Sequence, residues 1–118
     1  MNALVIINGK VEERDGSFVS SAWSGRNEQY DEPIPVEGFM LFDVDLNTIW
    51  MRQIYVAKSE RQKGWGTILF KHLHEIGKRE RCKSVKIHTT TSKKEPFGIL
   101  LGRLRYHKIE DNLFFRKL

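Results

Sequence analysis

The sequence predicts an α/β (α+β) fold with a mixed, mostly antiparallel sheet, a strand-loop-helix-strand unit and a C-terminal hairpin. Short segments rich in apolar or alternating side chains recur along the chain between turn residues, as strands do. One stretch, residues 67–81, instead carries apolar side chains at helical spacing. Because this helix stands between two predicted strands, it marks a βαβ unit inside the sheet.

The chain has 118 residues, of which 40% are hydrophobic and 30% charged, with only 3 prolines. This composition supports one packed core and excludes collagen-like, low-complexity and wholly disordered classes. We take 1–118 as a single domain, in which 1–35 form a reduced N-terminal hairpin and loop and 36–118 the core. No apolar run approaches the roughly 20 residues of a membrane helix, the N-terminus lacks a basic leader, and the single cysteine suits a reducing compartment. We therefore expect a cytoplasmic protein with no membrane partner.

The net charge of +5 is unevenly distributed. Residues 1–57 hold 4 basic and 9 acidic residues, a net charge of −5, whereas residues 58–118 hold 16 and 6, a net charge of +10. The basic half suits nucleic acid, an anionic membrane or a polyphosphate cofactor, and charge alone does not choose among them.

The N-terminal part is predicted to be a hairpin and a loop. Between Gly9 and Trp23 the sequence favours a hairpin whose turn is Arg14, Asp15 and Gly16, with residues 3–7 extending its first strand. Residues 25–35 mix charges, glycine and two prolines without any periodicity, so they are predicted to be a loop. No helix is expected in this half.

The rest of the chain is predicted element by element. Residues 36–45 and 49–57 are apolar-rich strands joined by a turn at 46–48, and they are expected to pair antiparallel. A polar loop leads to the helix 67–81, whose apolar face includes positions 65, 68, 69, 73 and 76. Residues 83–91 alternate as a strand, 95–104 form a short helix weakened by Gly98 and Gly102, and 106–118 form a hairpin turning at Asp111 and Asn112.

The stretch Arg61-Gln62-Lys63-Gly64-Trp65-Gly66-Thr67 lies directly between a buried strand and the amphipathic helix. Such a turn leaves backbone N–H groups unpaired at the helix N-terminus, and glycines let a phosphate approach them. The segment is neither a Walker A motif nor a Rossmann fingerprint. It is either a pyrophosphate cradle or simply a tight strand-to-helix turn.

The pattern Arg-x-x-Gly-x-Gly opening a helix resembles the acetyl-coenzyme A signature of the GCN5-related N-acetyltransferases, the GNAT superfamily. Val56 ends the preceding strand, with four residues between it and Arg61, and the helix, strand, short helix and terminal hairpin then follow in the family's order. The resemblance covers about residues 36–118. It implies a minimal GNAT-like domain that uses acetyl-coenzyme A and moves its acetyl group by direct attack onto an amine of a small molecule or macromolecule.

The resemblance also implies a role for each part of the motif. The backbone N–H groups of Gln62, Lys63, Gly64, Trp65, Gly66 and Thr67 would hold the pyrophosphate, with added charge from the Arg61 and Lys63 side chains, and the Trp65 side chain would belong to the core. Exposed backbone groups of Ile54, Tyr55 and Val56 would pair with the pantetheine arm. An N–H in that strand would stabilise the oxyanion, and no covalent enzyme intermediate is expected.

The sequence departs from the family's catalytic pattern. If Arg105-Tyr106 stands where the family has Gly-Phe, Leu101 occupies the position of the usual tyrosine acid, and Tyr106 is then a core residue. Either water protonates the thiolate, or the chain is a catalytically inactive GNAT-fold interaction protein that binds a protein partner or nucleic acid. Glu37 is the candidate general base, with Asp43 beside it, although each carboxylate alone is more often an inert surface group.

The sequence also indicates what kind of acceptor the site would take. The short N-terminal half predicts an open acceptor site that suits a macromolecular amine, and the acidic half favours cationic amines.

His72 and His74 point about 200° apart on a helix, so no metal site is expected. For His88 we prefer an exposed position on a strand face over a role at the cleft, and Cys82 is expected in the core rather than as a nucleophile. Nucleic acid is the second choice of partner, because the aromatic residues of the basic half fall at core-like positions.

Overall fold

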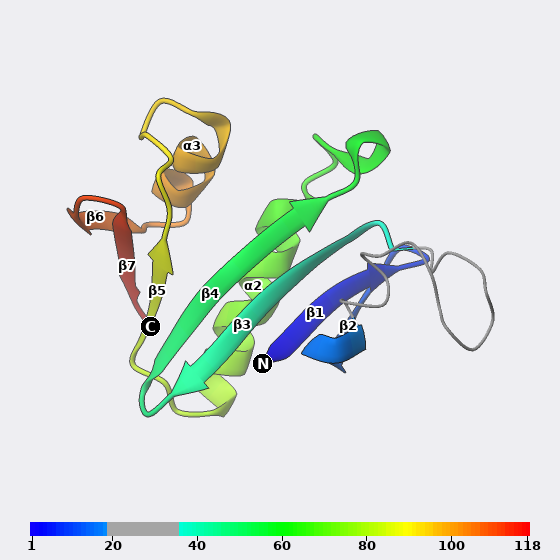
Figure 1. Cartoon of the computed structure of the whole chain (residues 1–118), viewed down its shortest axis with the longest axis horizontal. Coiled ribbons are helices and arrows are strands. Elements are labelled where there is room, and N and C mark those ends of the chain that lie inside the picture. Colours follow the sequence, from blue (N-terminus) through cyan, green and yellow to red (C-terminus); the bar gives the residue numbers. More distant parts are fainter. Residues whose placement is uncertain (19–35) are drawn as a thin grey trace.

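The computed structural model describes residues 1–18 and 36–118, and within them the chain forms one mixed sheet with helices against it (Figure 1). The described strands follow the order β2-β1-β3-β4-β5-β7-β6. Their bounds are β1 Asn2–Ile7, β2 Lys10–Asp15, β3 Gly38–Asp45, β4 Thr48–Val56, β5 Ser84–His88, β6 His107–Glu110 and β7 Leu113–Lys117. The helices are a 3₁₀ turn η1 (Lys58–Glu60), α2 (Trp65–Arg79) and α3 (Pro96–Arg103). All neighbouring strands pair antiparallel except β4 and β5, so the predicted fold class is confirmed.

The first hairpin is placed differently from the prediction. β1 and β2 pair around Asn8 and Gly9, whose φ angles are 51° and 75°, so the predicted turn at 14–16 is wrong. Residues 14 and 15 belong to β2, and residues 16–18 are helical, which also corrects the expectation of no helix in this half. Asn-Gly suits a two-residue turn because both of its residues readily adopt positive φ. The part of the predicted hairpin after residue 18 and the predicted loop 25–35 lie outside the described residues.

The elements from β3 onward agree with the prediction to within a few residues. β3 and β4 pair antiparallel around the turn that the sequence indicates, and the terminal hairpin β6–β7 turns at Asp111 and Asn112. Helix α2 begins at Trp65 rather than Thr67, and it ends at Arg79 rather than Arg81. The parallel pairing of β4 with β5 around α2 completes the βαβ unit.

Helices α2 and α3 end in the same backbone motif. The residue after the C-cap adopts a left-handed conformation, with φ of 59° at Arg81 after α2 and 65° at Arg105 after α3. The next N–H then bonds back to a carbonyl in the last turn, over 2.7 Å from Cys82 to Gly77 and 2.9 Å from Tyr106 to Leu101. These are Schellman motifs, which explains why α2 stops short of the predicted end.

The core lies between α2 and one face of the sheet, along which α2 runs in Figure 1. Fully buried side chains of α2 include Leu69, Phe70 and Leu73. Cys82 and Tyr106 are buried, as the sequence predicts, and so is Leu101. Trp65, although expected in the core, is only partly buried and packs against it. Within the described ranges, no helix is long and apolar enough to cross a membrane.

Candidate functional site

The parallel strands β4 and β5 separate at one end, and this separation opens a cleft. Their register runs from Thr48 and Ser84 to Met51 and Ile87, after which β4 continues to Val56 without a partner in the described part of β5. A bulge in β4 at Arg52, where the register with β3 shifts, lies at the point of separation. The resulting cleft, of about 440 Å³, is lined by residues 51–56 of β4, by Ile87, His88 and Thr89, and by Arg61 and Phe97. The predicted residues Ile54, Tyr55 and Val56 therefore line it.

The N-terminus of α2 forms a second cleft, of about 330 Å³. Gly64 is the N-cap with φ of 84°, and no side chain caps the helix. The N–H groups of Trp65, Gly66 and Thr67 consequently have no carbonyl one turn earlier to bond. A Cβ on Gly64 would meet nothing within 4 Å, so the approach to these donors is open. This geometry fits an anion on the helix N-terminus.

Helix α3 forms the opposite wall of this second cleft. A Cβ on Gly66 would lie only 3.0 Å from Leu100 Cδ2, so glycine lets α3 pack closely over the start of α2. Pro96, Leu100 and Arg103 of α3 line the cleft. The indole Nε1 of Trp65, at the start of α2, is buried and finds no acceptor among the described residues. Of the α3 side chains, Arg103 brings a positive charge to this cleft.

Of the two cationic side chains of the motif, Arg61 lines the clefts and Lys63 does not. Arg61 lines both clefts and donates from Nε to the carbonyl oxygen of Val56 over 3.1 Å, so it stands at their junction. Lys63 forms an ion pair with Glu60, and its side chain does not line either cleft. Arg103 lines the second cleft in its place. No pattern in the sequence indicates Arg103, because its position depends on how α3 packs on α2.

The carboxylates considered as bases lie outside both clefts. The Glu37 carboxylate accepts hydrogen bonds from the N–H of Gly9 over 3.0 and 3.2 Å and so holds the β1–β2 turn. Asp43 forms ion pairs with Arg52 over 3.0 Å and with the amino terminus over 3.8 Å. Neither residue lines a cleft, and each has a structural partner.

One titratable side chain in the β4–β5 cleft has suitable chemistry for proton transfer. His88, exposed at the end of β5, lines the cleft and stacks on the Trp50 ring with centroids 5.3 Å apart and planes at 13°. Leu101, predicted to occupy the position of the usual tyrosine acid, is fully buried and lines neither cleft. Among the described residues, no three of His, Cys, Asp and Glu gather in a way that would hold a metal ion.

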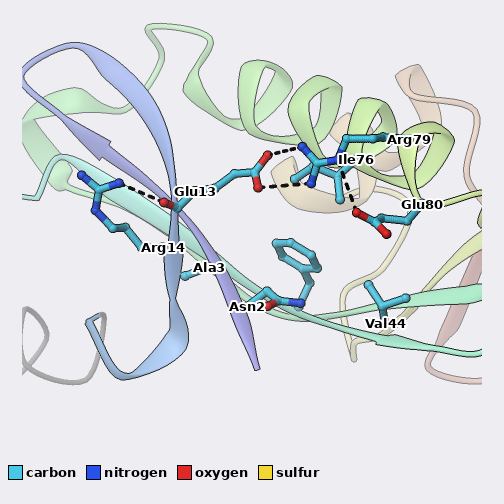
Figure 2. A pocket seen from close by; sticks show the side chains of 9 residues that line it. Asn2, Ala3, Glu13, Arg14, Val44, Ile76, Arg79 and Glu80 are labelled. Atoms are coloured by element: carbon cyan, nitrogen blue, oxygen red, sulfur yellow. Dashed lines mark hydrogen bonds and ion pairs between the residues drawn. The ribbon is translucent and has the colours of Figure 1, made fainter.

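A third cavity, of about 280 Å³, lies away from these clefts, between the edge of the sheet and the end of α2 (Figure 2). Arg79 crosses it to form a two-pronged ion pair with Glu13 of β2, over 2.8 and 3.2 Å, and a further pair with Glu80. Arg14, which also lines the cavity, pairs with Glu12. Because both arginines are paired with carboxylates, we interpret the cavity as a structural link between the edge strand and the helix.

Comparison with known proteins identifies the arrangement. A model of the acetyltransferase (GNAT) family matches residues 9–96. Among solved structures, Ard1 from Thermoplasma volcanium is 15% identical, with a TM-score of 0.60, over 70% of this chain and 64% of that one. An acetyltransferase from Bacillus cereus is 17% identical, with a TM-score of 0.63, over 78% and 68%. The PaiA N-acetyltransferase from Thermoplasma acidophilum, solved in complex with coenzyme A, is 14% identical, with a TM-score of 0.57, over 70% and 54%.

These structural likenesses, all at low identity, show the shared fold. The chain spans less than two thirds of the length of the first of these proteins. No curated protein sequence matches the chain significantly. The family model, in contrast, covers well over half of the chain and includes the splayed strand, the glycine turn and α2. The chain is a member of the acetyltransferase (GNAT) family.

Proposed function

We propose that this protein transfers the acetyl group of acetyl-coenzyme A to an amine nitrogen by direct attack. The observation that carries the proposal is the continuity of the two clefts, since Val56 and Arg61 line both. One cleft is lined by the stretch of β4 that lies beyond its pairing with β5, and the other by the uncapped start of a helix. Together they suit a ligand with an extended, amide-bearing arm and a pyrophosphate.

The residues present fit that ligand. The N–H groups of 62–67 would hold the pyrophosphate, with charge supplied by Arg61 and Arg103, while the Lys63 charge is partly offset by Glu60. The backbone of Ile54, Tyr55 and Val56 would pair with the pantetheine arm along the first cleft. When bound, acetyl-coenzyme A supplies a thioester, which is the acyl donor.

The chemistry needs a proton acceptor beside the splayed strand. The amine nitrogen bonds to the acetyl carbon as the C–S bond breaks, and a backbone N–H of β4 stabilises the oxyanion that develops. We assign the amine proton to a ring nitrogen of His88, because this residue lines the cleft and the Glu37 carboxylate does not. With Leu101 in the core, the thiolate takes its proton from water.

The first experiment measures binding. Calorimetry with acetyl-coenzyme A should show binding to the wild type and none to Gly64→Glu, because a carboxylate in the cleft would repel the pyrophosphate. Gly64→Ala is the matched control: its Cβ meets open space, so it should keep binding, although the left-handed backbone costs roughly 1 kcal/mol of folding free energy. If titration of the wild type with acetyl-coenzyme A releases no heat, and about millimolar ligand does not raise its thermal stability, the proposal is refuted.

The second measurement decides between an enzyme and a GNAT-fold interaction protein without catalysis. With a polyamine or peptide amine as acceptor, coenzyme A release should fall about 100-fold in His88→Gln, at unchanged affinity for acetyl-coenzyme A. Glu37→Gln should leave this rate unchanged and lower only stability, since its carboxylate holds the Gly9 turn. Cofactor binding without any turnover across acceptors would favour the non-catalytic function.

A further inference from the structure

A cationic pocket of about 330 Å³ lies between α2, the end of α3 and β7, beyond the two clefts. Among its lining side chains only Glu75 is acidic, whereas five are cationic: Lys71, Lys78, Arg103, Arg105 and Arg116. Three different elements and one loop position contribute these cations. The tertiary fold therefore brings them together, rather than a run of basic sequence.

No carboxylate among the described residues neutralises the charges of this pocket. Within residues 1–18 and 36–118, none of the five cations forms an ion pair with a carboxylate. The contrast is Arg79 in Figure 2, which is paired with both Glu13 and Glu80. Like charges gathered in one pocket repel one another, and a bound anion would offset that repulsion.

One of the cations is held in place by a buried histidine. Arg116 Nη1 lies 2.5 Å from His74 Nδ1, and because arginine can only donate, Nδ1 is the acceptor. The proton of neutral His74 must then sit on Nε2, which donates to the Tyr106 hydroxyl oxygen over 2.6 Å. The guanidinium of Arg116 is thus oriented without a counter-ion from the described part of the chain, and its remaining donors face the pocket.

We propose that this pocket binds a phosphate monoester. Arginine side chains grip the oxygens of phosphate in pairs, and a dianion matches the surplus of positive charge. Because Arg103 lines both this pocket and the cleft at the start of α2, the 3′-phosphate of coenzyme A is one source, and this part rests on the proposed function. A separate phosphorylated ligand is the other source.

The first arm of the test compares coenzyme A with dephospho-coenzyme A, which lacks only the 3′-phosphate. Calorimetry should give coenzyme A at least about tenfold tighter binding, the size of one or two charge-assisted hydrogen bonds. Arg105→Gly should reduce this preference several-fold. Arg81→Gly is the matched control, since it removes one positive charge at the equivalent left-handed position of α2, which does not line the pocket. Glycine suits both positions, so neither variant should fail to fold.

The second arm titrates inorganic phosphate into protein saturated with dephospho-coenzyme A. Binding that is lost in Arg105→Gly and kept in Arg81→Gly would support the pocket with a separate source. Equal affinity for the two coenzymes, together with no phosphate binding, would overturn the inference and leave the proposed function standing. If neither coenzyme binds, the proposed function fails, and titration of the free protein with phosphate alone then decides the pocket.

Discussion

His74 is a buried base that the proposed reaction does not use. Burial lowers its pKa to about 4, and the positive charges of Arg116 on β7 and Lys78 on its own helix act in the same direction. The groups facing the ring are Arg116, the Tyr106 hydroxyl and the Phe70 ring. Since Arg116 donates to Nδ1, a proton on that nitrogen would break the contact. Neutral His74 is therefore part of the folded structure.

This histidine predicts a pH dependence of stability. Its pKa is lower in the folded protein than the ordinary 6.5, so the unfolded chain binds more protons between about pH 6.5 and 4. The free energy of unfolding should consequently fall as pH decreases through this window, by at most about 3 kcal/mol, and change no further from this group below it. Urea unfolding at about pH 7, 5.5 and 4 measures the slope. His74→Gln should flatten it and His72→Gln should not; an unchanged slope in His74→Gln would assign it to other groups.

At the scale of elements, periodicity predicts the second half of the chain and misplaces the first hairpin. The apolar spacing at 65, 68, 69, 73 and 76 identifies the inner face of α2, and alternation identifies β5. For the first hairpin, the sequence predicts a turn at Arg14, Asp15 and Gly16, whereas the structure turns at Asn8 and Gly9, which are also a turn dipeptide. The hairpin that turns at Asn8 and Gly9 pairs all six residues of β1 with β2, and Leu4, Val5 and Ile6 of β1 are buried. Burial of a whole strand, a tertiary effect, decides between two adequate turns.

The candidate site, too, can be predicted from the sequence only in part. Residues contiguous along the chain, from Ile54 to Thr67, can be assigned from the motif, because a strand, its turn and the following helix are local in sequence. Arg103, His88 and the pocket around Arg116 reach the site region from other elements. Their positions follow from helix packing and strand order. No spacing within one segment indicates them.

The two glycines of α3 are predicted to behave oppositely. A Cβ on Gly98 would lie 1.8 Å from the Ser92 carbonyl oxygen, a backbone atom that cannot easily move, so Gly98→Ala should cost more than about 2 kcal/mol. A Cβ on Gly102 meets nothing within 4 Å, so Gly102→Ala should stabilise the helix by roughly 0.5–1 kcal/mol. Thermal and urea unfolding of the two variants gives both values. Similar changes at the two positions would mean that the loop before α3 does not pack on Gly98 as described.

At the scale of the whole molecule, the division of charge follows the sheet. The acidic half of the sequence supplies β2, β1, β3 and β4, and the basic half supplies β5, β7 and β6 with α2 and α3 (Figure 1). Both proposed anion sites, the start of α2 and the cationic pocket, lie in the basic half. Several acidic side chains of the other half are already paired, as Glu13 is with Arg79 and Asp43 with Arg52. The net charge of the half of the chain that holds the proposed cofactor sites is therefore positive.

This field predicts that coenzyme A binding depends on ionic strength. Its phosphates would be attracted by a region of net charge +10, and added salt screens that attraction, because the Debye length shortens from about 14 to about 4 Å between roughly 50 and 500 mM salt. The dissociation constant should rise about tenfold over this range, mainly through a slower association rate, as stopped-flow mixing would show. Pantetheine, which lacks every phosphate, is the matched control, and its affinity should change little. A salt-insensitive affinity for coenzyme A would mean that hydrogen bonds from the backbone at the start of α2, rather than the charge of the basic half, dominate its binding.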